Sequence, residues 1–210
     1  MKLTKKLAVI ASSFAIASSA QAIDLSGLYG GVSYLAEVNH DEARISSATD
    51  VRGDQKDSGY GLFIGYQLND IVGIELAYRD LGEAVTDYNN GDGTRAKITT
   101  ERQHASLDLV LGKEVYPNLR LFAKVGYGVL YADTNGTDPV TTNAVTAIIG
   151  ESLSDQGANY GLGAQYNFGK MFVRAEYEQL PEAGYAQTLT SWQGPASEPE
   201  VYSVSFGASF

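Results

Sequence analysis

The chain has 210 residues, a length typical of one domain, with 23 Gly, 14 Tyr and no Cys. Lys and Arg total 15 against 25 Asp and Glu, and the resulting net charge of -10 argues against a nucleic-acid-binding protein, which would need a basic surface. The absence of Cys excludes a disulfide scaffold, thiolate metal sites and a cysteine nucleophile.

Residues 1–22 have the organisation of a secretory signal peptide. Lysines within residues 1–6 precede an apolar stretch at 7–16, and small residues within 20–22 provide a cleavage site. We therefore expect an exported mature domain at 23–210, in which 12 basic residues face 25 acidic ones. The alternative is a short N-terminal helix kept in the mature protein. Nothing later approaches the roughly 18 consecutive apolar residues that a transmembrane helix needs.

Alternation of apolar and polar residues, typical of strands with two different faces, runs through almost the whole mature sequence. It is clearest at residues 157–168, where apolar side chains occupy the even positions and glycines or amides the odd ones. In chain order, this pattern predicts eight strands, at residues 27–38, 58–68, 71–81, 100–116, 119–132, 157–168, 171–180 and 199–210.

Short and long connections alternate between these strands. Asn69-Asp70, Pro117-Asn118 and Gly169-Lys170 are suited to tight turns. The other connections are long polar segments at residues 39–57, 82–99, 133–156 and 181–198. Long connections at one end only predict an all-β fold, an eight-stranded antiparallel up-and-down transmembrane β-barrel. The even strand number places both termini at the short-turn end.

The same alternation would suit a soluble barrel with an apolar interior. Across the middle of the strands, however, the apolar face carries no charged residue, and its tyrosines lie mostly toward the strand ends. The opposite face carries twelve glycines, which suit the narrow interior of an eight-stranded barrel better than a solvated surface. This composition favours an apolar face toward lipid, with a soluble periplasmic barrel as the alternative.

The face predicted to line the lumen carries five acids and five bases, namely Glu37, Glu75, Asp108, Glu176, Glu178, Arg79, Arg102, Arg120, Lys124 and Arg174. Balanced charge favours ion pairs that plug the barrel, and a conducting, gated pore is the alternative. The four long connections hold 14 acids and 5 bases, so the acidity of the protein is expected mainly outside the cell.

Several segments resemble the N-terminal transmembrane domain of OmpA-type outer-membrane proteins, namely Gly59–Gln67, Val72–Arg79, Leu81–Gly82, Leu111–Gly112, Lys124–Tyr127, Tyr131–Thr134, Arg174–Tyr177 and Val204–Phe210. The resemblance covers essentially the whole mature chain and implies an outer-membrane barrel with periplasmic termini and extracellular loops. It implies contact with outer-membrane lipids and lipopolysaccharide, and recognition of the terminal Phe210 by the barrel-assembly machinery. We expect no peptidoglycan-binding domain, because the chain stops at the last strand.

The Glu–Arg pair associated with the gate of this family corresponds to Glu75 and Arg174. The alternative lysine and glutamate partners of the family fall on Val110 and Gln165 here, and this departure from the family pattern favours a permanently plugged interior over a switch between two pairings. Further candidates for pairing in the lumen are Arg79, Lys124, Arg102, Asp108 and Glu176.

His104 and Ser106 are the one arrangement that suggests nucleophilic catalysis, because residues two apart on a strand share a face. The carboxylate expected to orient the histidine would fall near Asn118, which is no acid, and Asp108 is the only local substitute. His104 and Ser106 are also predicted to face the lumen, away from lipid substrates. We therefore predict no enzyme, no metal site and no cofactor, with a lipid A-modifying barrel enzyme as a remote alternative.

The sequence thus predicts a non-enzymatic integral outer-membrane protein that supports envelope integrity. Its acidic loops would present a surface to an extracellular or host ligand. A small diffusion pore for ions or little solutes is the alternative function.

Overall fold

The computed structural model describes residues 26–37, 50–55, 58–89, 95–137, 152–181 and 199–210. Within these residues no helix is long and apolar enough to cross a membrane. The predicted signal peptide at 1–22 lies outside the described residues. The strands are β1 (Leu28–Glu37), β2 (Asp50–Gln55), β3 (Ser58–Gln67), β4 (Val72–Asn89), β5 (Arg95–Tyr116), β6 (Leu119–Thr137), β7 (Ser152–Phe168), β8 (Met171–Gln179) and β9 (Glu200–Ser209).

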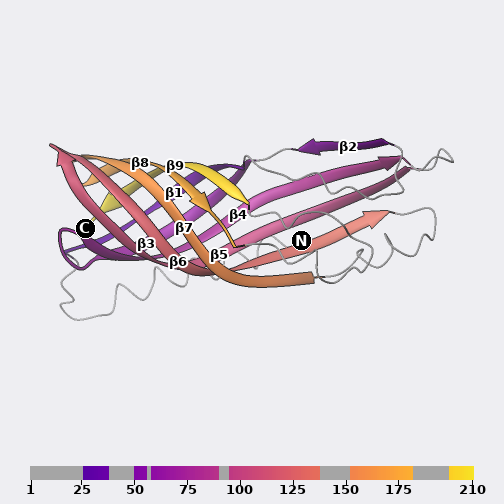
Figure 1. Ribbon diagram of the computed structural model, residues 1–210. Coiled ribbons are helices and arrows are strands. Elements are labelled where there is room, and N and C mark those ends of the chain that lie inside the picture. The colour runs from indigo at the N-terminus through magenta and orange to yellow at the C-terminus, as the bar shows by residue number, and fades with distance from the viewer. Residues whose placement is uncertain (1–25, 38–49, 56–57, 90–94, 138–151, 182–198) are drawn as a thin grey trace.

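Eight of these strands close an antiparallel barrel (Figure 1). Neighbours in the barrel follow the order β1-β3-β4-β5-β6-β7-β8-β9, and β9 returns to pair with β1, where Tyr29 lies opposite Ser209. Closure satisfies the backbone groups that a sheet edge would leave unpaired in lipid. The predicted eight-stranded up-and-down barrel is confirmed.

Three tight turns define one end of the barrel, named here the short-turn end. They join β3 to β4, β5 to β6 and β7 to β8, as predicted. In the first, the Asn69 Oδ1 atom accepts hydrogen bonds from the backbone N–H groups of Ile71 and Val72, both at 2.9 Å. In the other two, Asn118 and Gly169 adopt positive φ angles of 66° and 71°, which suit asparagine and glycine.

The strands extend further at the opposite end, named here the long-connection end, than the sequence pattern predicted. The segment 82–99 is mostly a hairpin rather than a loop, because β4 and β5 stay paired as far as Asn89 and Arg95. Likewise, β6 and β7 extend into 133–156, and β2 forms within 39–57 and pairs with β4. Backbone pairing continues there without an apolar face, so the alternation that predicts a strand is missing from these segments. Figure 1 shows β4, β5 and β6 projecting beyond the rest of the barrel.

A β-bulge interrupts β4 at the long-connection end of the barrel. The register with β5 shifts between Asp80 and Gly82, and Gly82 has a φ of +84°. The Asp80 Oδ1 atom accepts a hydrogen bond from the Gly82 N–H group at 3.1 Å. A bulge leaves one residue without a cross-strand partner and re-aims its side chain. Here that residue is Leu81, whose side chain is buried.

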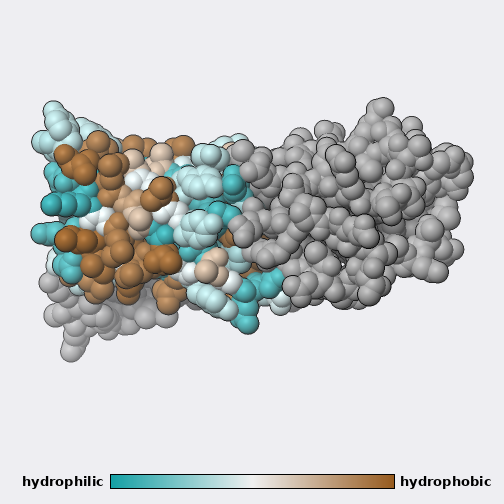
Figure 2. Space-filling model, viewed as in Figure 1, coloured by the Kyte–Doolittle hydropathy of each residue, from teal (hydrophilic) through white to brown (hydrophobic). Residues whose placement is uncertain are grey.

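The two faces of the barrel differ as the alternation predicts. Apolar side chains point outward, with Leu107 61% and Leu162 64% exposed, whereas the Glu75 side chain in the lumen is 1% exposed. Figure 2 shows apolar residues gathered in a band over the barrel strands. At the edge of this band toward the long-connection end, the rings of Tyr177 and Tyr202 lie 5.1 Å apart between centroids. An outward apolar belt with tyrosines at its edge matches a lipid-facing surface.

Candidate functional site

Glu75 and Arg174 meet across the lumen. They belong to β4 and β8, which are four strands apart in the closed ring of eight and therefore on opposite walls. The Arg174 Nη1 atom lies 2.7 Å from Glu75 Oε2. Its Nε and Nη2 atoms donate to Gln165 Oε1 on the neighbouring β7, at 3.0 and 2.9 Å. The guanidinium is thus held at two points, one on each side of the lumen.

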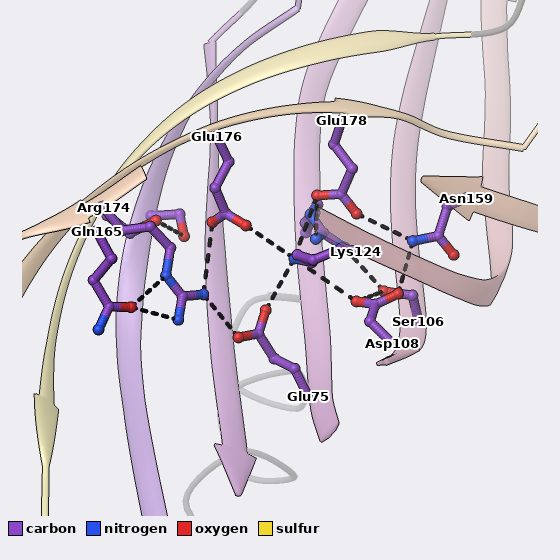
Figure 3. A network of polar contacts seen from close by, with 12 residues as sticks. Glu75, Ser106, Asp108, Lys124, Asn159, Gln165, Arg174, Glu176 and Glu178 are labelled. Atoms are coloured by element: carbon purple, nitrogen blue, oxygen red, sulfur yellow. Dashed lines mark hydrogen bonds and ion pairs between the residues drawn. The ribbon is translucent and has the colours of Figure 1, made fainter. Parts of the chain in front are cut away.

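Lys124 on β6 lies among four carboxylates (Figure 3). Its Nζ atom is 2.9 Å from Glu75 Oε1 and 3.1 Å from Glu176 Oε1. Glu178 Oε2 and Asp108 Oδ2 are slightly further away, at 3.7 and 3.8 Å. Glu75 is therefore shared between two cations, the ammonium of Lys124 and the guanidinium of Arg174.

Glu75 pairs with a lysine as well as with Arg174, but that lysine does not stand at the position to which the resemblance assigns it. The family resemblance placed that lysine at position 110, which is Val110 on β5. In the barrel, Lys124 on β6 is the direct cross-strand partner of Val110 and supplies the ammonium instead. The ammonium therefore comes from the strand next to β5, directly opposite Val110.

A second ion pair spans the lumen between the same two walls. The Arg79 Nη2 atom on β4 contacts Glu178 Oε2 on β8. Asn159 Nδ2 connects this pair to the rest, donating to Glu178 Oε1 at 3.1 Å and to Asp108 Oδ1 at 2.7 Å. The sequence analysis did not single out Asn159, whose position on the glycine- and amide-rich face of β7 was the available signal.

The charged residues that meet across the lumen in these contacts are all buried, each no more than 9% exposed: Glu75, Asp108, Glu176, Glu178, Arg79, Lys124 and Arg174. A buried ion is costly unless it is paired and hydrogen-bonded. Four carboxylates against three cations give the layer nearly balanced charge. These residues, together with Ser106, Asn159 and Gln165, are named here the ionic layer.

Aromatic rings surround the Arg174 guanidinium. Its Cζ atom lies 4.7 Å from the ring centroid of Phe63, 5.0 Å from that of Phe122, 5.3 Å from that of Phe172 and 5.4 Å from that of Tyr29. A guanidinium within about 6 Å of a ring centroid is attracted by the ring quadrupole, and the attraction is stronger away from water. Arg174 is therefore held by charge, hydrogen bonds and rings together.

Lumen glycines make room for these rings. A Cβ atom at Gly163 would lie 2.2 Å from Phe122 Cζ, and one at Gly207 would lie 2.3 Å from Phe172 Cζ. Such distances are well inside van der Waals contact, so no larger residue fits without displacing a ring. The glycines that the sequence placed on the inner face are thus sites of close packing.

The remaining predicted residues lie nearer the ends of the barrel. Arg120 donates from Nη1 to Gln67 Oε1 at 2.7 Å near the short-turn end. Arg102 is half-buried on β5 toward the long-connection end. Phe210 is 59% exposed, and its N–H group donates to Leu28 O at 2.9 Å. The side chain of Glu37 lies outside the described part of the structure.

His104 and Ser106 do not form a nucleophile and base in the described contacts. The Ser106 hydroxyl donates to Asp108 Oδ2 at 2.9 Å and accepts from Arg79 Nη1 at 3.1 Å. The same Arg79 atom lies 3.2 Å from His104 Nδ1. Within the residues that the structure describes, no group of three or more His, Asp or Glu side chains is arranged to hold a metal ion.

Comparison with known proteins finds a family model and several solved structures that are similar to this chain. The sequence model described as "Outer membrane protein beta-barrel domain" matches residues 7–210. The structure of OprG from Pseudomonas aeruginosa has a TM-score of 0.51 at 16% identity, over 88% of this chain and 96% of that chain. Ail of Yersinia pestis has a TM-score of 0.47 at 16% identity, over 88% and 95% of the two chains. A search of curated protein sequences finds no match.

Proposed function

The chain belongs to the outer membrane protein β-barrel domain family, and from this premise we propose that it is a sealed structural barrel. It neither conducts solutes nor catalyses a reaction, and it supports the integrity of the outer membrane. In the proposed orientation the short-turn end faces the periplasm and the long-connection end faces the exterior.

The observation that carries this proposal is the ionic layer. Side chains from opposite walls meet at the level of Glu75, where Arg174 and Lys124 approach the same carboxylate. Removing one partner of a buried ion pair typically costs about 3–5 kcal/mol, because the other charge is left unpaired. A passage through this layer would have to separate several such contacts at once.

The burial of His104 and Ser106 supports a non-enzymatic role. His104 is fully buried and Ser106 nearly so, and the hydroxyl is committed to Asp108 and Arg79. A serine nucleophile needs a histidine base within hydrogen-bond reach and a path to its substrate. Lipid substrates would meet the outer face of the barrel, on the other side of the strands.

The outside of the barrel determines its proposed partners. The apolar belt would contact outer-membrane lipids and lipopolysaccharide, and the barrel-assembly machinery would recognise Phe210. The acidic long connections would present negative charge to the exterior, which favours an extracellular or host ligand with a basic surface.

Planar-bilayer recording of the purified wild-type protein tests the proposal. We expect no persistent openings from a preparation whose folded state is verified by a gel shift between unheated and boiled samples. Persistent openings would establish the diffusion pore instead. A change in the lipid A mass spectrum on Ser106→Ala would establish the enzyme.

A deletion strain tests the envelope role separately. Cells without the protein should become more sensitive to detergent, and expression of the wild-type chain should restore resistance. Unchanged sensitivity would contradict the structural role even if the barrel does not conduct.

A further inference from the structure

The ionic layer is enclosed between two apolar layers. Toward the short-turn end, Phe122 and Phe172 lie two residues before Lys124 and Arg174 on the same strands, and both rings are buried. Toward the long-connection end, other apolar side chains follow the charged ones. The lumen therefore changes from aromatic to ionic to aliphatic along its axis.

The layer on the long-connection side is formed by five aliphatic residues, named here the aliphatic layer: Leu35, Leu81, Leu130, Leu180 and Val201. Each is only 1–3% exposed, and together they form one packed cluster. Leu81 and Leu180 lie two residues beyond Arg79 and Glu178, the ion pair nearest this end. Their burial in the lumen is unexpected for a membrane barrel, whose interior is ordinarily polar.

The aliphatic layer reaches across the lumen. Leu35 belongs to β1 and Leu130 to β6, which are four strands apart in the closed ring of eight and so on opposite walls. The β-bulge adds Leu81 to this layer, because the unpaired residue of β4 turns inward. Side chains from separate parts of the wall thus belong to one cluster that spans the lumen.

We infer that the aliphatic layer is a second barrier to ions, in series with the ionic layer. The inference rests on the proposed function, because it concerns how the sealed state is maintained. Hydrophobic constrictions close pores by excluding water, and an unpaired ion is unstable in an apolar surrounding. An ion that passed the ionic layer would still meet a constriction lined by buried aliphatic side chains, so rearrangement of the ion pairs alone leaves the barrel closed.

Single-channel recording of three variants in planar bilayers tests this inference. The first is Glu75→Ala, which removes the carboxylate shared by Lys124 and Arg174. The second is the double variant Leu35→Ser and Leu130→Ser, and the third combines all three substitutions. A matched control carries Glu75→Ala with Leu35→Met and Leu130→Met, which keep the layer apolar.

We expect the first two variants and the methionine control to remain closed like the wild type. The combined variant should raise the mean current by about tenfold or more, a change equivalent to about 1.4 kcal/mol of barrier. Every variant must first show the gel shift of a folded barrel between unheated and boiled samples. Where the combined variant folds poorly, Leu130→Ser alone in the Glu75→Ala background provides the same comparison.

Each other outcome contradicts a distinct part of the argument. If Glu75→Ala alone conducts as well as the combined variant, the aliphatic layer is no barrier and the inference fails. If the combined variant stays closed, the two layers do not account for the seal and the inference also fails. If the double variant Leu35→Ser and Leu130→Ser conducts with Glu75 intact, the two layers do not act in series. The ion pairs then do not plug the lumen, as the proposed function requires. Openings of the wild type would instead contradict the proposed function itself.

Discussion

Val110 on β5 and Lys124 on β6 are direct cross-strand partners, and together they explain how the ionic layer differs from the expected pattern. Val110 is fully buried and, being valine, carries no charge. Lys124, on the strand next to that of Val110, places its ammonium 2.9 Å from Glu75 Oε1. The result is one carboxylate held by two cations at the same time.

Substitution of Glu75 tests the energetic importance of this shared carboxylate. Glu75→Ala should lower the free energy of unfolding by about 3–5 kcal/mol, because Lys124 and Arg174 lose a buried partner. Urea unfolding of the refolded barrel in lipid vesicles measures the change. Lys113→Ala, at an exposed position, serves as the control and should change stability little. An equal effect at both positions would contradict the assigned role of Glu75.

Arg174 should not be replaceable by lysine. Arg174→Lys keeps the positive charge but loses the fork that contacts Glu75 and Gln165 together, and it weakens the contacts with the four rings. We expect a loss of about 1.5–3 kcal/mol in the free energy of unfolding, the range for hydrogen bonds to charged groups. Arg120→Lys, nearer the barrel end, should cost less in the same urea titration. Similar losses for the two variants would show that the aromatic surroundings of Arg174 contribute nothing.

A methyl group added to the lumen should be tolerated only where space allows. Gly163→Ala would place a Cβ atom 2.2 Å from Phe122 Cζ, whereas at Gly73 the nearest atoms, Gln67 Oε1 and the backbone oxygen of Tyr66, are both 3.3 Å away. Overpacking costs about 1–3 kcal/mol, so Gly163→Ala should lower the urea midpoint clearly more than Gly73→Ala does. Equal midpoints would indicate that the ring moves freely and that the packing is loose.

A charge on the outer face tests the orientation toward lipid. Leu109 lies in the apolar belt, so Leu109→Arg should lower the free energy of unfolding in lipid vesicles by about 2–4 kcal/mol. Leu68→Arg, beside the first tight turn, should cost at most about 1 kcal/mol because the membrane edge is polar. The difference between the two free energies of unfolding is the measurement. Equal costs would mean that Leu109 does not face hydrocarbon.

The candidate site was predictable in its residues but not in its contacts. Alternation along a strand assigns each side chain to one face, which is why the sequence predicts Glu75, Arg79, Lys124 and Arg174 on one inner face; the structure buries all four. Which of them meet depends on strand tilt and register around a closed ring, and a single strand does not contain that information. The pairing of Arg79 with Glu178 therefore emerged only from the structure.

The long-connection end was predicted poorly for a related reason. Strands buried on one face carry an apolar period, whereas the outer parts of β4 and β5 do not. The bulge that turns Leu81 inward also breaks the alternation just where the predicted strand ended. Both features depend on backbone pairing with a neighbour rather than on the local sequence.

By itself the sequence determined the number of strands in the barrel, the tight turns, the lipid-facing side and the set of charges on the inner face, because a period of two residues and turn chemistry are local properties. The tertiary structure alone decided that Glu75 holds two cations, that rings surround Arg174 and that Leu35 and Leu130, from opposite walls, belong to one packed cluster. These contacts join residues far apart in the chain, and their distances are set by how the ring of strands closes.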